Sequence, residues 1–145
     1  MRRRLTLTIA AVLLAGAGFV AWQARGDGSD TTASAAGSVA GFAERSVTAG
    51  AVTVKGQPRR VDGQGAVFKV VFDTHSEELD LDVARAARLE VDGVPWPGAV
   101  WDGDGPSGHH REGELRFPAG GTPAGKVRLT VSGLSGPVEF RWTLP

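Results

Sequence analysis

Apolar and polar residues alternate with a period of two along most of the chain beyond residue 50. The clearest case ends the chain, where Val138, Phe140, Trp142 and Leu144 alternate with polar neighbours. This pattern is typical of β-strands that bury one face and expose the other. Shorter segments with the same alternation are found at 52–55, 66–73, 79–83, 88–91, 114–117 and 127–132.

Turn signals separate these segments. The pair Asp92-Gly93 predicts a tight hairpin, and Pro95 and Pro97 place the segment that follows, 94–101, at a sheet edge. Residues 84–87 are compatible with a single helical turn. About seven or eight short strands with closely spaced turns favour an all-β fold, an antiparallel immunoglobulin-like β-sandwich. A small barrel is the alternative.

The N-terminus has the pattern of a targeting segment. Arg2, Arg3 and Arg4 precede an uncharged apolar run from Leu5 to Trp22. As a helix these 18 residues would span about 27 Å, close to the thickness of a bilayer core. We expect residues 1–23 to be an uncleaved signal anchor, a single transmembrane helix, with a cleaved signal peptide as the alternative. Both place the rest of the chain on the extracytoplasmic side of the cell membrane, or outside the cell if cleavage releases it.

Residues 24–50 are rich in Ala, Gly, Ser and Thr and show no sustained period. We interpret them as a flexible linker with a root-mean-square reach of about 25–30 Å. The predicted organisation is therefore an anchor or signal at 1–23, a linker at 24–50 and a β-sandwich domain at 51–145.

Composition narrows the chemistry. The chain has no cysteine, which excludes disulfides, thiolate metal sites and thiol catalysis. From Thr31 onward, 12 Lys and Arg stand against 14 Asp and Glu, a net charge of −2. A slightly acidic domain argues against nucleic acid as a partner, because nonspecific binding needs a basic face.

All three histidines of the chain lie in two polar loops that adjoin predicted strands. His75 follows Asp73 in one loop, and His109 and His110 are adjacent in the other. If the two strands are neighbours, these imidazoles and the Asp73 carboxylate could share a copper(II) or zinc ion. Asp73 would be a ligand or would accept a hydrogen bond that orients the His75 ring. His109 and His110 could reach one metal only from a loop or bulge, since adjacent strand residues face opposite ways.

A structural interpretation of the same loops stays open. Asp73 and Ser76 would hydrogen-bond local backbone in a turn. One of the adjacent histidines would pack over Trp101. Arg111 would pair with Glu112 or Glu114 as an ordinary surface charge.

The two histidine motifs, with their flanking segments, resemble a group of small bacterial extracytoplasmic β-rich domains that have no assigned activity. The resemblance covers about residue 51 to the C-terminus and implies a shared architecture and a common role for the loops. It is carried by Asp73-Thr74-His75-Ser76, Leu79-Asp80-Leu81-Asp82, Trp101-Asp102-Gly103 and the run from Gly108 to Pro118.

The sequence thus predicts a membrane-tethered extracytoplasmic domain without catalytic activity. The specific hypothesis is divalent metal binding through the loop histidines. The alternative is a protein-interaction module of the cell envelope, in which a sheet edge near Pro95-Trp96-Pro97 recruits a partner by strand addition.

Overall fold

A computed structural model of the chain describes residues 42–145. The predicted anchor at 1–23 and the first part of the predicted linker at 24–50 lie outside the described residues. Within the described range, no helix is both long enough and apolar enough to cross a membrane.

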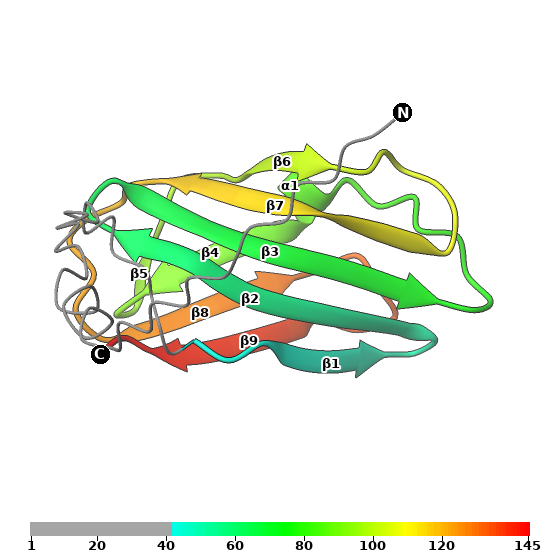
Figure 1. The fold of residues 1–145 in the computed structure, drawn as a ribbon, viewed down its shortest axis with the longest axis horizontal. Helices are drawn as coiled ribbons and strands as arrows, with labels where there is room; N and C mark the ends of the chain where they lie inside the picture. Colours follow the sequence, from blue (N-terminus) through cyan, green and yellow to red (C-terminus); the bar gives the residue numbers. More distant parts are fainter. Residues whose placement is uncertain (1–41) are drawn as a thin grey trace, which may run out of the picture. The chain divides into compact units, whose positions relative to one another are not determined.

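The described residues form two antiparallel β-sheets, shown in Figure 1. The first has the strand order β1-β2-β3-β7-β6 and the second has the order β5-β4-β8-β9. The all-β class predicted from the alternation is therefore confirmed for this part of the chain. The elements are β1 (Arg45–Ala49), β2 (Val52–Asp62), β3 (Gly65–Thr74), α1 (Val83–Ala86), β4 (Ala87–Val91), β5 (Val94–Pro95), β6 (Val100–Gly103), β7 (His110–Pro118), β8 (Lys126–Val131) and β9 (Val138–Thr143).

The apolar faces of the two sheets share one core. Phe68 of β3 lies with its ring centroid 5.6 Å from that of Trp142 of β9, so the two sheets meet through aromatic contacts. Phe68 also packs edge-on against Phe117 of β7, at 6.0 Å. Each such side chain, once buried, stabilises the fold by about 1.5–3 kcal/mol. The period-two alternation thus has a direct physical cause, because one face of each strand borders this core.

The hairpin predicted at Asp92-Gly93 is present between β4 and β5. Both residues have positive φ, 55° and 82°, as the favoured two-residue hairpin turn requires. The Asp92 carboxylate accepts hydrogen bonds from the backbone N–H groups of Lys126, at 2.7 Å, and Ala124, at 3.0 Å. These bonds attach the hairpin to the start of β8.

Gly103 and Gly113 lie directly opposite each other on β6 and β7. A Cβ atom on Gly113 would be 2.5 Å from the Gly103 Cα and 2.7 Å from the Trp101 ring. The two glycines therefore leave the space that the Trp101 side chain fills, and a larger residue at either position would clash with the ring. Its indole N–H donates to the Asp104 carbonyl at 2.9 Å, which positions the loop that leads to the adjacent histidines.

Two predicted boundaries differ from the structure. Residues 45–49, inside the predicted linker, form β1, and Phe42 before them is buried. Their pairing with Val52–Gly56 of β2 adds a strand that their own composition does not signal. The helical turn predicted at 84–87 is present one residue earlier as α1, because Asp82 caps it by accepting from the Arg85 N–H at 3.1 Å.

The alternation at 79–83 predicted a strand, and this prediction is wrong. Residues 75–82 form an irregular connection from β3 to α1, and so lead from one sheet to the other. Leu79 and Val83 are buried and Leu81 packs against the core. The apolar positions thus come from a connection that covers one end of the core rather than from a paired strand.

Candidate functional site

The two histidine motifs lie side by side because β3 and β7 are neighbouring antiparallel strands. In their register Asp73 faces His110. The pairing extends into the loops, where the Thr74 N–H donates to the His109 carbonyl at 2.9 Å and the Leu79 N–H donates to the Gly108 carbonyl at 3.0 Å. The adjacency of strands on which the predicted shared site depended is therefore present.

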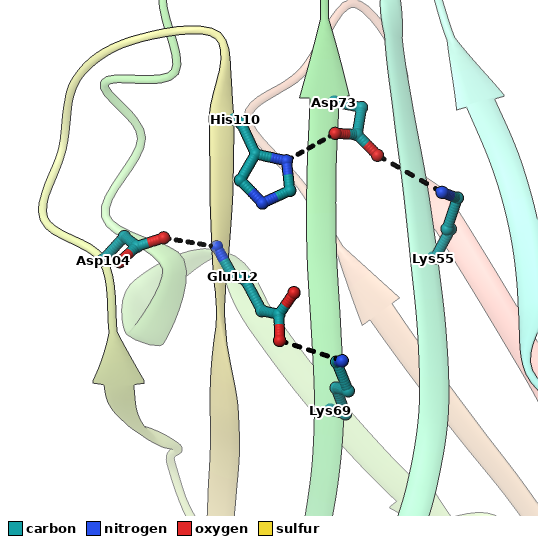
Figure 2. Close-up of polar contacts among 6 residues, drawn as sticks. All are labelled: Lys55, Lys69, Asp73, Asp104, His110 and Glu112. Atoms are coloured by element: carbon teal, nitrogen blue, oxygen red, sulfur yellow. Dashed lines mark hydrogen bonds and ion pairs between the residues drawn. The ribbon is translucent and has the colours of Figure 1, made fainter.

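Asp73 and His110 form a polar cluster with Lys55 on the outer face of the five-stranded sheet, as Figure 2 shows. The His110 Nδ1 lies 2.6 Å from Asp73 Oδ1, and the Lys55 Nζ lies 3.4 Å from Asp73 Oδ2. The hydrogen bond from His110 is the main cause that lowers the pKa of Asp73 below its ordinary value, and Lys55 adds to the effect. Asp73 therefore orients the His110 ring, whereas the sequence suggested that it would serve His75.

His109, which precedes β7, is held in a comparable way by the loop that follows β3. Its Nδ1 lies 2.9 Å from the Glu77 carbonyl oxygen, in the loop that follows His75. A carbonyl and a carboxylate only accept, so Nδ1 carries the proton in both rings. In the neutral tautomer, the lone pair of both His109 and His110 is then at Nε2.

The predicted metal-ligating residues are not gathered into one group. Among residues 42–145, no three His, Asp or Glu side chains lie close enough to hold a metal ion together. His75 is exposed in the loop beyond β3. His110 begins β7 and pairs with Asp73 across the outer sheet face, whereas His109 precedes the strand and contacts Glu77. This divergence follows from the opposite directions of adjacent side chains on an extended backbone.

Arg111 has a structural role that the sequence pattern did not predict. It was expected to pair at the surface with Glu112 or Glu114, but its side chain is buried, at 2% exposure. Its Nη1 donates to the carbonyls of Leu79, at 3.1 Å, and Leu81, at 2.8 Å. Burial lowers the pKa of Arg111 below its ordinary value.

A third carbonyl, that of Asp104, accepts from Arg111 Nη2 at 3.1 Å and from Nε at 3.4 Å. The guanidinium carbon also lies 5.9 Å from the Trp101 ring centroid. Arg111, rather than a histidine, is thus the residue that packs against Trp101. Its hydrogen bonds also join the loop after β3 and the loop before β7 to strand β7. The sequence did contain a sign of this burial. Leu115 and Phe117 face inward at alternate positions of β7, and position 111 continues the same alternation.

Two further polar residues order the same loops. The Thr74 hydroxyl, on a buried residue, accepts from the N–H groups of Ser76, at 3.4 Å, and Glu77, at 3.3 Å. The Asp104 carboxylate accepts from the Glu112 N–H at 2.8 Å (Figure 2). Most of the conspicuous polar residues of the two motifs therefore support the backbone of the loops.

A separate apolar hollow of about 650 Å³ lies where the segment 95–99 passes between the two sheets. Trp96 and Phe117 line it together with Pro95, Pro97 and the alanines of the adjoining elements. Val94 and Val100 flank this segment and are 53% and 60% exposed, the large hydrophobic residues most exposed in the described range. The segment around Pro95-Trp96-Pro97, predicted to be a sheet edge, therefore connects edge strand β5 to edge strand β6 and borders this hollow.

Comparison with known proteins finds no matching family model, no matching curated protein and no matching solved structure. The resemblance drawn from the histidine motifs stays a prediction.

Proposed function

We propose that the described domain is an immunoglobulin-like β-sandwich. The order β2-β3-β7-β6 in one sheet and β4-β8-β9 in the other corresponds to the A-B-E-D and C-F-G orders of that architecture. β1 and β5 would then be additions at the sheet edges. The barrel alternative required one continuously paired sheet, whereas the described strands divide into two.

We propose further that this domain is a non-catalytic protein-interaction module of the cell envelope, tethered to the membrane by the predicted anchor at 1–23. The observation that supports this function best is the apolar hollow beside Trp96. Val94 and Val100, the residues on either side of segment 95–99 in the sequence, are both exposed. A concave apolar surface with exposed aliphatic residues next to it in the chain is typical of a binding site.

The expected occupant is an extended segment of a partner protein that carries aliphatic and acidic side chains. β6 is an edge strand, paired on one side with β7, so its other side can accept an added strand. Aliphatic side chains would fill the hollow against Trp96 and Phe117. Arg85 and Arg88 line the same hollow and no carboxylate does, so acidic groups would be attracted to it.

A panning experiment tests this function. A phage-displayed library of random eight-residue peptides is selected on the full chain in a nonionic detergent, and the affinity of selected peptides is measured by fluorescence polarisation. We expect peptides with alternating aliphatic and acidic residues. Val100→Lys should weaken their binding about tenfold, the amount expected from losing the burial of one valine side chain.

The matched control is Thr48→Lys, which places the same charge on β1, the opposite edge of the same sheet. Its binding should equal that of the wild type. Failure to select any peptide above the empty support, or equal loss of binding in both variants, would overturn the proposal.

A second candidate function, binding of copper(II) or zinc, is favoured by one observation. Both His109 and His110 have Nδ1 held by an acceptor, the arrangement that leaves Nε2 free for a metal. As placed, the four predicted residues do not form a coordination sphere, so the loop with His75 would have to move.

Calorimetric titration of the full chain with each metal tests this candidate. Wild-type protein should bind stoichiometrically, and both His110→Ala and His75→Ala should lose most of the affinity. Weak binding of equal strength in all three proteins would remove the candidate without affecting the peptide-binding proposal.

A further inference from the structure

A basic hollow, distinct from the Trp96 hollow, lies on the outer face of the second sheet. It has a volume of about 510 Å³ and is lined by residues of β4, β8 and β9 and by Arg45 at the start of β1. Four cationic side chains line it and a single carboxylate, that of Glu90, accompanies them. The cations are Arg45, Lys126, Arg128 and Arg141.

The charge of this surface opposes that of the domain. Residues 42–145 hold 12 Lys and Arg against 14 Asp and Glu, a net charge of −2. The lining of the hollow, with four cations and one carboxylate, has a formal charge of +3, and Glu139, which pairs with Arg141 beside it, reduces the local charge to +2. Acidic residues gather instead in loop 75–82, beyond the other end of β8, where the Ser132 N–H bonds to Ala86. The net charge of the domain therefore does not explain why this hollow is basic.

Cross-strand pairing concentrates the positive charge. Arg128 lies directly opposite Arg141 in the β8–β9 register, and like charges in such positions repel. Glu90 pairs with Arg128, and Glu139 lies 2.5 Å from the Arg141 Nε. Arg45 and Lys126 have no carboxylate oxygen within 4.0 Å among the described residues, so two cations of the hollow stay uncompensated.

We propose that this hollow binds a phosphate group, supplied by an anionic lipid headgroup or by a soluble phosphate ester. Arginine guanidinium groups match phosphate oxygens with paired hydrogen bonds, and lysine adds a point charge. The Thr143 hydroxyl, opposite Lys126 in the register, is a further donor at the same end. An anion bound beside Arg45 and Lys126 would neutralise the two cations that no carboxylate of the described residues pairs.

The predicted tether makes a lipid headgroup accessible. Arg45, the first residue of β1, lines the hollow, so the chain enters the domain beside the basic surface. If the predicted linker is confined to residues 24–41, its root-mean-square reach would be about 21–25 Å, short enough to leave this surface near the headgroups. Basic residues close to an anionic membrane each strengthen attachment.

NMR titration of the isotope-labelled full chain, in a nonionic detergent, tests the site. The probes are dihexanoyl-phosphatidylglycerol, dihexanoyl-phosphatidylcholine and inorganic phosphate. Saturable shifts of the Lys126, Arg128 and Arg141 signals with phosphatidylglycerol alone would assign a lipid headgroup. Comparable shifts with inorganic phosphate would assign a soluble source. Shifts with neither anionic probe, or equal shifts with phosphatidylcholine, would overturn the proposal.

Two double variants, each of which removes two positive charges, test whether the phosphate binds in this hollow. In Arg45→Gln/Lys126→Gln we expect at least fivefold weaker binding of the active probe, with a smaller dependence on salt. The control Lys55→Gln/Lys69→Gln removes the same charge from the outer face of the other sheet and should bind as the wild type does. Equal weakening in both pairs would mean a diffuse charge effect and would contradict a site in this hollow. Neither pair alters the Trp96 hollow, so failure here leaves the peptide-binding proposal intact.

Discussion

The buried Arg111 allows a quantitative test of what holds the two histidine loops in place. In Arg111→Met the long apolar stem is kept, but the guanidinium donors are lost. The carbonyls of Leu79, Leu81 and Asp104 then lose their partner. An unpaired buried carbonyl costs about 1–3 kcal/mol.

These carbonyls belong to loops at the end of the domain, where water can replace part of the lost bonding. We therefore take the lower end of the range, about 1 kcal/mol for each carbonyl. The gain from no longer burying a charge offsets part of any larger loss. The expected decrease in the free energy of unfolding is about 3 kcal/mol for Arg111→Met. Arg111→Lys keeps the charge but can reach fewer carbonyls, so its free energy of unfolding should lie between those of the wild type and Arg111→Met.

Urea denaturation of the full chain, followed by far-UV circular dichroism, measures this change. The control is Arg116→Met on the same strand, because Arg116 faces outward and pairs with Asp102 and Glu114. Its unfolding midpoint should stay close to that of the wild type.

Hydrogen exchange adds a local readout. The amide of Leu79, which donates to Gly108 across the two loops, should exchange much faster in Arg111→Met. If Arg111→Met and Arg116→Met unfold at the same urea concentration, or if the Leu79 amide stays protected, the argument that Arg111 joins the loops is refuted.

Three further predictions concern the charge cluster, the strand edge and the core. The pKa of Asp73 is lowered in the folded state, so its ionised form stabilises the fold above about pH 4, and this contribution is lost as the pH falls through the folded pKa. The contribution is below about 1 kcal/mol, because the site is exposed. When the free energy of unfolding is measured against decreasing pH, Asp73→Asn should not show this loss. Gly113→Ala forces a Cβ against Gly103 and the Trp101 ring and should destabilise by about 1–3 kcal/mol in urea, whereas a neutral result would mean that the two strands separate freely. Leu129→Ala, at a fully buried position of β8, should cost about 3–4 kcal/mol, and a loss below 1 kcal/mol would show that the core relaxes around the cavity.

Much of the strand content was predictable because it depends on local sequence. The alternation at 66–73, 127–132 and 138–144 predicted β3, β8 and β9, and Asp92-Gly93 predicted the hairpin. β1 was missed because five residues with a weak pattern become a strand only through pairing with β2. The segment 79–83 shows the converse, since the same alternation covers one end of the core without forming a strand.

The candidate sites depended more strongly on pairing in space. The sequence placed Asp73, His109 and His110 in two loops, and the β3–β7 register brought those loops together. The same register assigned Asp73 to His110, because it is these two residues that face each other. The burial of Arg111 could have been predicted, because Leu115 and Phe117 face inward at alternate positions and position 111 continues that alternation. The carbonyls that accept its hydrogen bonds could not, because they come from two separate segments, and those of Leu79 and Leu81 are distant in the chain.

By itself, the sequence determined that the chain beyond residue 50 is built of short amphipathic strands and that no thiol chemistry is available to it. These properties follow from the spacing of apolar side chains and from composition. The tertiary structure alone decided which strands are neighbours, that an arginine is buried under the histidine loops, and that basic residues of β1, β8 and β9 surround one hollow. The reason is that strand alternation depends on nearest neighbours in the chain, whereas charge clustering and buried hydrogen bonds depend on residues that only the packing of two sheets brings together.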